Sequence, residues 1–265
     1  MTAATAEEAP PRIGWVPVPE HAFNGANRSP VAAPVRLGPL LAVCGLAGGA
    51  GVTTLSYLIA LAAVRQWADP VLVADTGGPS GGLAACAGVE APRSLGELAE
   101  QLATGVPLGG GLYATGRYGL RVLATGPEFS TSGRDGQVRE LLADAREAHG
   151  LTVIDCGTLA REAEQTAAAA ATHIAWVLTA TTYGVARGRR VLEAAQRMAG
   201  RELIVARNDV RQPSAPLRQL RRIAAERRAL LVLVPHLTGL EAGRIEASVE
   251  AAQVPVQAIL GALRR

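Results

Sequence analysis

A glycine-rich loop near residue 50 has the residue types in this chain that best suit ligand chemistry. An apolar run at 39–44 precedes the loop, and a helix-forming run at 55–63 follows it. A strand, a glycine loop and a helix in that order let backbone N–H groups and the helix N-terminus surround a phosphate. The candidate nucleotide-binding residues in the loop are Gly48, Gly49, Ala50, Gly51, Val52, Thr53 and Thr54.

The charges of this loop do not match that chemistry. All 26 basic residues of the chain are arginines, and Val52 stands directly before the two threonines, where a phosphate-neutralising lysine is expected. Drift in a GC-rich genome would replace a needed lysine with arginine, not with valine. Two interpretations stay open. The loop binds ATP or ADP with Mg²⁺, or it is a tight turn between strand and helix that binds no ligand.

The loop resembles that of the ParA/MinD family of deviant Walker A P-loop ATPases, which reads Lys-Gly-Gly-x-Gly-Lys-Thr-Thr. Both family lysines are missing here, because Ala47 stands at the signature lysine and Val52 at the phosphate lysine. The remaining positions match, namely Gly48, Gly49, Gly51, Thr53 and Thr54.

Three later segments extend this resemblance. Asp75 matches the first aspartate of the family's Asp-x-Asp motif, but Gly77 replaces the second, which helps to position the attacking water. Asp155 follows an apolar run as the Walker B aspartate does, and Asn208 stands where the family often contacts the base. The resemblance therefore implies a Mg²⁺ site at Thr53, Asp75 and Asp155, and a base contact at Asn208.

Hydrolysis is expected to be lost. Phosphoryl transfer needs charge neutralisation on the transferred group and a positioned nucleophile. The chain lacks both lysines and the aspartate that positions water, and one lost preorganised contact typically costs about 10²–10³ in rate. We therefore assign no catalytic residue. An arginine from another element or from a partner is the alternative that would restore activity.

The pattern of apolar runs predicts an α/β fold with a doubly wound, mostly parallel sheet flanked by helices. Residues 1–36 are rich in Pro and Ala and are predicted to form a flexible, disordered tail before a domain at 37–265. Strands are predicted at 39–45, 70–75, 119–124, 151–155, 173–179, 202–207 and 230–234. Helices are predicted at 53–67, 94–104, 134–149, 161–171, 184–200, 214–228, 239–251 and 255–264, and mobile loops at 76–88 and 105–117.

The second half of the domain is strongly basic. Between Arg187 and Arg228, twelve arginines are opposed by four acidic residues, whereas the whole chain has a net charge of +3. This stretch is either a solvated helix surface or a surface for DNA, anionic lipid or an acidic partner. The candidate basic face comprises Arg187, Arg189, Arg190, Arg218, Arg221 and Arg222.

The C-terminal segment 255–265 places four apolar residues on one helical face, namely Val256, Ile259, Leu260 and Leu263. The resemblance invites comparison with the short membrane helix of MinD-like proteins, and a helix packed on the sheet is the favoured alternative. No signal-peptide pattern is present, and the apolar runs are shorter than the roughly 20 residues that a membrane span needs. We expect a cytoplasmic protein, with peripheral contact to the inner face of the membrane left open.

The function expected from the resemblance is that of a catalytically degenerate ParA/MinD-like protein. It would position or scaffold a larger assembly, such as pilus, septum, conjugation or secretion machinery, through protein partners. Because Ala47 cannot reach a second subunit's phosphates, any homodimer is expected to form independently of nucleotide. Two alternatives stay open. One is an active ATPase of partition or localisation type that uses an arginine in place of lysine, and the other is a nonspecific DNA-binding module acting through the basic face.

Overall fold

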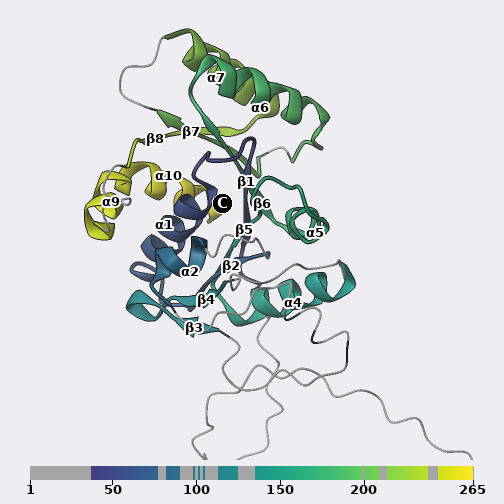
Figure 1. Cartoon of the computed structure of the whole chain (residues 1–265), viewed down its shortest axis with the longest axis vertical. Helices are drawn as coiled ribbons and strands as arrows, with labels where there is room; N and C mark the ends of the chain where they lie inside the picture. The colour runs from purple at the N-terminus through teal and green to yellow at the C-terminus, as the bar shows by residue number, and fades with distance from the viewer. Residues whose placement is uncertain are drawn as a thin grey trace, which may run out of the picture. The chain divides into compact units, whose positions relative to one another are not determined.

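Short apolar runs form the strands of one eight-stranded sheet (Figure 1). The computed structural model describes residues 37–76, 82–89, 98, 101, 104, 113–124, 135–198, 200–208, 214–237 and 244–264. The strand order is β3-β4-β2-β5-β1-β6-β7-β8, and all neighbours pair in parallel except β3 with β4. The strands are β1 (Leu40–Gly45), β2 (Val71–Asp75), β3 (Ala114–Thr115), β4 (Arg121–Leu123), β5 (Leu151–Asp155), β6 (His173–Thr179), β7 (Glu202–Asn208) and β8 (Leu230–Pro235).

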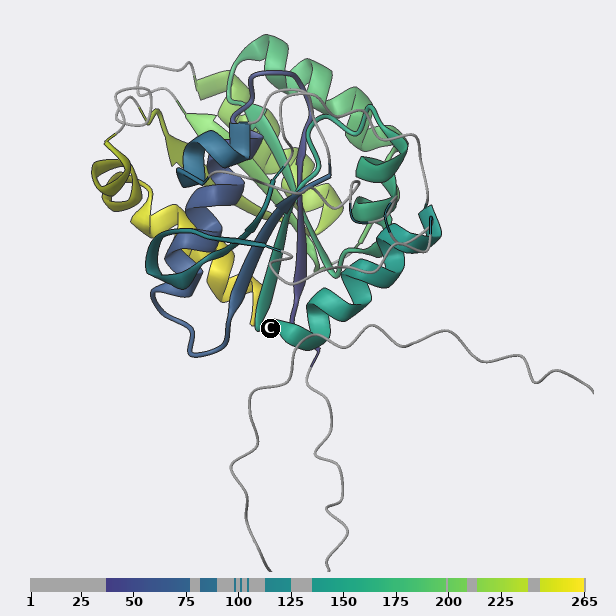
Figure 2. The same cartoon turned by 60° about the horizontal axis from the view of Figure 1, so that its bottom comes forward.

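Helices cover both faces of the sheet, and the predicted doubly wound α/β fold is confirmed (Figure 2). On one face, α1, α2 and α10 bury apolar residues against alternate strand positions such as Leu41 and Val43. On the other face, α4, α5, α6 and α7 pack against the intervening positions, such as Leu40 and Ala42. The helices are α1 (Val52–Val64), α2 (Gly82–Ala87), α4 (Asp135–Ala148), α5 (Glu162–Ala170), α6 (Thr182–Ala194), α7 (Ser214–Arg227), α9 (Ile245–Ala251) and α10 (Gln253–Leu263), with a 3₁₀ turn η1 (Arg117–Gly119).

The central strands are buried on both faces, as their continuous apolar runs predict. Every residue of β1, β2 and β5 is buried. This pattern is typical of parallel strands covered by crossover helices. The thiols of Cys44 and Cys156 lie within this core.

Several boundaries differ from the predicted ones. The strand predicted from 119 begins at Arg121, because Tyr118 and Gly119 both have positive φ and turn the chain. The helix predicted to reach residue 200 ends at Ala194, where Ala195 is extended. The short helix α2 forms inside the stretch 76–88, which was predicted to be a mobile loop. The tail 1–36, most of the helix predicted at 94–104 and most of the loop 105–117 lie outside the described residues.

The C-terminal helix α10 packs within the domain. Its apolar residues Val256, Ile259, Leu260 and Leu263 are at most 5% exposed and belong to the core that α1 shares. The favoured interpretation of a helix packed on the sheet is therefore confirmed, and the apolar face proposed for a membrane is not on the surface. Among the helices that the structure describes, none combines the length and apolar character needed to cross a bilayer.

A buried ion pair fastens α6 and α7 to the sheet. Glu202 opens β7, and its carboxylate accepts hydrogen bonds from Arg227 Nε at 2.7 Å and Nη2 at 2.8 Å. Arg227 also donates to the carbonyl oxygens of Leu192 and Gln196 at the end of α6. The exposed fractions are 5% for the Arg227 side chain and 0% for Glu202. The pair thus fixes the two helices that carry the predicted basic face.

Removing one member of this pair should destabilise the domain strongly. Arg227→Ala leaves the Glu202 carboxylate buried without its cation, and breaking a buried pair in this way typically costs about 3–5 kcal/mol. Urea denaturation followed by circular dichroism measures the change. Arg222→Ala is the matched control, since Arg222 and Glu226 form an exposed pair at 3.5 Å, and such pairs contribute close to zero. Equal stability of the two variants would contradict this account.

Candidate functional site

The glycine loop follows β1, which lies between β5 and β6 in the sheet. Gly45 N donates to Gly157 O at 2.6 Å, and Leu46 N donates to Val177 O at 2.9 Å, so the loop begins between the ends of β5 and β6. Gly49 and Gly51 have φ of 71° and 93°, a region that favours glycine. These two positive φ values account for glycine at both positions and give the loop its turn into α1.

The start of α1 presents backbone donors to this loop. Gly51 is the N-cap residue, and Leu55 N donates to Gly51 O at 2.9 Å. The N–H groups of Val52, Thr53 and Thr54 precede the first intrahelical bond and therefore have no acceptor within the helix. An added Cβ on Gly48, Gly49 or Gly51 would meet no described atom within 4 Å, so the loop faces open space. The arrangement offers converging donors to an anion.

Val52 turns its side chain away from that space. It is 8% exposed and belongs to the apolar core beneath α1. A Cβ added to Gly45 would lie 2.7 Å from Val52 Cγ2, so the valine packs on the end of β1. Ala50 is likewise buried. At both positions, only the backbone offers a polar group to a ligand in the loop.

The three residues predicted to hold Mg²⁺ lie together where the start of α1 meets the ends of β2 and β5. Thr53, Asp75 and Asp155 line one cavity of about 80 Å³. Asp75 and Asp155 are partners in the register of β2 and β5, which places both carboxylates at the same end of the sheet. Asp155 accepts a hydrogen bond from Gly157 N at 3.0 Å, and Thr53 lies beside it on the same cavity.

A further carboxylate, that of Glu164, lines the same cavity and was not predicted from the sequence. It is 7% exposed and accepts a hydrogen bond from Arg161 N at the start of α5. Its Oε1 would lie 3.0 Å from a Cβ on Gly157. Burial raises the pKa of Glu164 and of Asp155, and in Asp155 the nearby Thr53 hydroxyl and the Gly157 N–H oppose this rise. In a sequence, a glutamate in the first turn of a helix is typical of a capping residue. The pattern therefore gave no separate indication that Glu164 lines a ligand site.

The oxygen atoms of these side chains can supply part of the coordination shell of a Mg²⁺ ion. Mg²⁺ usually binds one or two carboxylates and completes its octahedron with waters and substrate phosphates. Within the part of the chain that the structure describes, no group of three His, Cys, Asp or Glu residues could hold a metal ion. The residues present therefore suit a Mg²⁺ that arrives with a phosphate ligand rather than a resident structural ion. Gly77, the replacement for the second aspartate, lies outside the described residues.

A second cavity, of about 120 Å³, lies where the loop faces the ends of β6, β7 and β8. Its walls are mostly apolar, with Arg207 and His236 as the basic groups among them. Asn208, the residue predicted to contact a base, does not line this cavity. Its predecessor Arg207 does, and Arg207 Nη1 lies 3.5 Å from Gly49 O. Only two features of the sequence could have pointed to Arg207 as a site residue. It stands at the end of a predicted strand, and the chain has no lysine.

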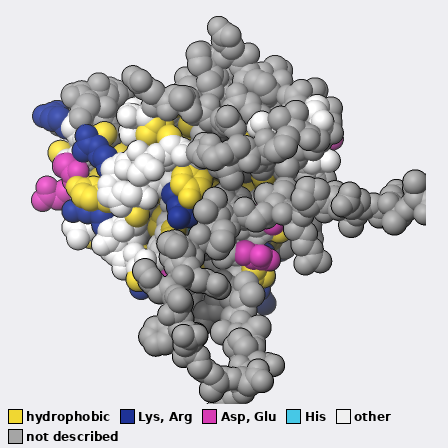
Figure 3. All heavy atoms as spheres, turned by 90° about the horizontal axis from the view of Figure 1, so that it is seen from below, with side chains coloured by type: hydrophobic (Ala, Val, Ile, Leu, Met, Phe, Trp, Pro, Cys, Tyr) yellow, Lys and Arg dark blue, Asp and Glu magenta, His cyan; other side chains and the backbone are white. Residues whose placement is uncertain are grey.

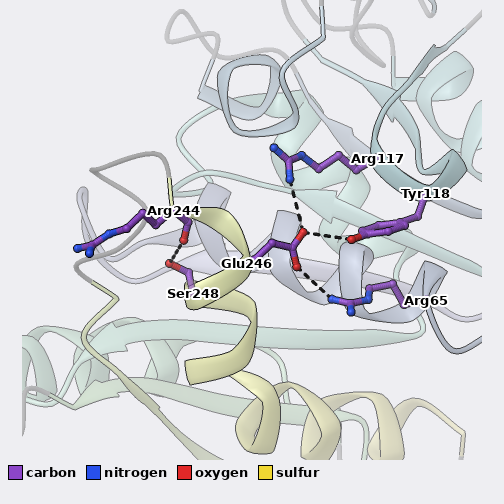
Figure 4. A network of polar contacts seen from close by, with 6 residues as sticks. All are labelled: Arg65, Arg117, Tyr118, Arg244, Glu246 and Ser248. Carbon is purple, nitrogen blue, oxygen red and sulfur yellow. Dashed lines mark hydrogen bonds and ion pairs between the residues drawn. The ribbon is translucent and has the colours of Figure 1, made fainter.

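A larger groove of about 550 Å³ lies away from the loop, between α1 and the helices α9 and α10. Beside it, Glu246 accepts hydrogen bonds from Arg65, Arg117 and Tyr118 at 3.4, 3.4 and 3.1 Å (Figure 4). The guanidinium of Arg65 also lies 5.2 Å from the centre of the Tyr118 ring. Glu246 and its two arginine partners are about half exposed, so these bonds contribute little individually. Together they connect α9 to α1 and η1.

The candidate basic face occupies the helices α6 and α7, which pack against each other (Figure 1). All six of its arginines are exposed, namely Arg187, Arg189, Arg190, Arg218, Arg221 and Arg222. Two have acidic partners one helical turn away, since Arg189 pairs with Glu193 at 2.7 Å and Arg222 with Glu226 at 3.5 Å. Figure 3 views the domain from below, away from α6 and α7, and acidic side chains lie beside arginines at the left of that view.

Comparison with solved structures identifies the fold. A ParA family ATPase from Chlorobium tepidum TLS matches with a TM-score of 0.66 and 13% identity, covering 82% of this chain and 92% of that one. MinD in the MinC:MinD complex of Aquifex aeolicus gives 0.64 and 14%, covering 84% and 96%. Cobyrinic acid a,c-diamide synthase from Mycobacterium smegmatis, with a bound ATP analogue and magnesium, gives 0.57 and 20%, covering 82% and 93%.

At these identities the likeness concerns the fold, which is that of the ParA and MinD ATPases. No protein-family model and no curated protein sequence matches the chain. Because a synthase shares the fold, the fold does not by itself assign a reaction.

Restoring a lysine to the loop tests whether its geometry still suits phosphate. Val52→Lys should lower the free energy of unfolding by about 1–2 kcal/mol, because a buried apolar side chain is lost. It should also tighten ADP binding about tenfold, because a charge-assisted hydrogen bond is gained. Thermal denaturation and calorimetric titration measure the two effects, with Val52→Met as an uncharged control of similar length. If Val52→Lys binds ADP no better than Val52→Met, the loop no longer has a phosphate-binding geometry.

Proposed function

We propose that this protein is a ParA/MinD-like P-loop protein that binds a nucleotide with Mg²⁺, has lost effective hydrolysis, and acts as a positioning or scaffolding factor for a larger assembly. One observation carries the proposal: Thr53, Asp75 and Asp155 line one cavity beside an open glycine loop, while the Val52 side chain is buried in the core. The parts that suit binding are thus present, and the charge that suits catalysis is absent.

Nucleotide binding is supported by groups that can contact a bound nucleotide before any reaction takes place. The loop N–H groups and the positive end of α1 favour a phosphate chain. Thr53, Asp75 and Asp155 supply oxygen atoms that would hold Mg²⁺ beside that chain. When bound, Mg²⁺ would neutralise phosphate charge. The carboxylates of Asp75 and Asp155, at the ends of two paired strands, would hold the Mg²⁺ in position.

The loss of hydrolysis is supported by what stands at the family's charged positions. Val52 and Ala47 carry no charge, and Gly77 cannot position a water molecule. A factor of about 10²–10³ for each lost contact is enough to bring turnover close to the uncatalysed rate. The protein would then respond to nucleotide binding alone.

The role in an assembly follows from the resemblance and from the fold of the structural neighbours. MinD is seen in complex with MinC, which is a precedent for a protein partner on this fold. We propose protein partners in pilus, septum, conjugation or secretion machinery, and a homodimer that forms independently of nucleotide because Ala47 cannot bridge two subunits. An active ATPase that uses an arginine in place of lysine is the rival proposal.

Phosphate release from ATP and Mg²⁺ should match the background rate, with or without DNA or lipid vesicles. Thr53→Ala, which removes the hydroxyl beside Asp155, should leave that rate unchanged. Light scattering on the same samples should give one oligomeric state in the presence and absence of ATP. Robust turnover that disappears in Thr53→Ala, or a dimer that appears only with ATP, would favour the active ATPase instead.

A second candidate function, nonspecific DNA binding, is supported by the six exposed arginines on α6 and α7. Replacing Arg187, Arg190 and Arg221 with Ala should weaken binding to a duplex of 30 base pairs and reduce its salt slope by up to about 3, because each phosphate contact contributes roughly 0.9. Replacing Arg65, Arg117 and Arg139 with Ala removes the same charge elsewhere on the domain. If both triple variants bind equally, the basic face is only a solvated helix surface.

A further inference from the structure

We infer that Arg207 supplies the positive charge to the nucleotide's phosphates that Val52 cannot supply. This inference rests on the proposed function, because it assigns a phosphate-binding residue to the same site. The sequence expectation at this strand end was a base contact from Asn208. The structure instead places the preceding residue at the loop.

The backbone of Arg207 is held firmly. It lies near the end of β7, paired with Thr179 of β6 on one side and Val234 of β8 on the other. Arg207 O accepts a hydrogen bond from Ala180 N at 2.9 Å. Side chains two residues apart point to the same face of a strand. Val205, two residues earlier, lies in the core that α1 covers, so Arg207 points to the face that carries the glycine loop.

The guanidinium of Arg207 reaches the loop directly. Its Nη1 lies 3.5 Å from Gly49 O, and the residue lines the 120 Å³ cavity together with Ala50, Gly51 and Thr54. A guanidinium carries its charge at every accessible pH and presents several donors in one plane, which suits phosphate oxygens.

The chemistry of the cavity favours a nucleoside polyphosphate over a free phosphate. One wall is apolar, with Val177, Val205 and Val234 at the ends of three adjacent strands. The opposite wall is formed by the loop and the first turns of α1. A flat apolar group can therefore occupy the cavity while its attached phosphates follow the loop past Arg207.

The position of Arg207 predicts a role in affinity rather than in turnover. The residues proposed to hold Mg²⁺ line a separate cavity, and Arg207 is not among its lining residues. A charge on the nucleoside side of the loop stabilises bound substrate and transition state alike, which improves binding without raising the chemical rate. This is consistent with a protein that binds nucleotide and does not hydrolyse it.

Calorimetric titration of the full chain with ADP and Mg²⁺ tests the inference. Arg207→Ala should weaken ADP binding about 10- to 100-fold, because it removes a charge-assisted contact. Arg207→Lys should recover part of that loss. Arg207→Gln keeps a donor near Gly49 O without the charge and should bind as weakly as the alanine variant. The matched control is Arg201→Ala, which removes the same charge just before β7, at an exposed position.

Titration with adenosine separates a phosphate contact from a base contact. Arg207→Ala should weaken adenosine binding far less than ADP binding, and thermal denaturation without ligand should show that all variants fold. An equal loss for ADP and adenosine would overturn the inference, because Arg207 would then contact the nucleoside. If the parent binds ADP and Arg207→Ala matches Arg201→Ala, the inference alone fails. If the parent binds no ADP, the proposed nucleotide site and the inference both fail.

Discussion

The parallel pairing of β1 with β5 and β6 is the constraint on which the candidate site depends. It brings the ends of three strands to one edge of the sheet, where Gly157 O and Val177 O accept the first hydrogen bonds of the glycine loop. The same edge carries Asp75 and Asp155, and farther along it carries Arg207. Ligands of open α/β sheets bind at this carboxyl edge, so each candidate group is positioned by the sheet itself.

The side chain at position 52 determines whether the glycine loop itself carries a positive charge. A lysine at position 52 would carry charge toward a phosphate, whereas Val52 packs on the end of β1 and contributes to the core. The backbone donors are unaffected by this exchange, since they depend on the loop conformation and not on the side chain. Under the proposed function, binding and catalysis, which P-loop ATPases combine in one loop, would therefore be separated in this chain.

Continuous apolar runs are local patterns, and they predicted the sheet and most of its strands. The meeting of Thr53, Asp75 and Asp155 was implied by the resemblance to the ParA/MinD motifs. The sequence did not predict β3, which is two residues long, or α2, whose six residues include one glycine at the start and lie in a glycine-rich segment. Arg207 and Glu164 were missed for a different reason. Their roles depend on which strand or helix lies beside the loop, and in a chain with 26 arginines no single arginine is conspicuous.

The most direct test of the account is the identity of the nucleotide that the protein retains. The purified chain is incubated with ATP and Mg²⁺, separated rapidly from free nucleotide and denatured, and the released nucleotide is identified by chromatography. We expect ATP to be recovered intact in a fixed ratio to protein, and much less of it from the Arg207→Ala variant. Recovery of ADP would show that the loop still hydrolyses ATP, and recovery of no nucleotide would show that the glycine loop is only a turn.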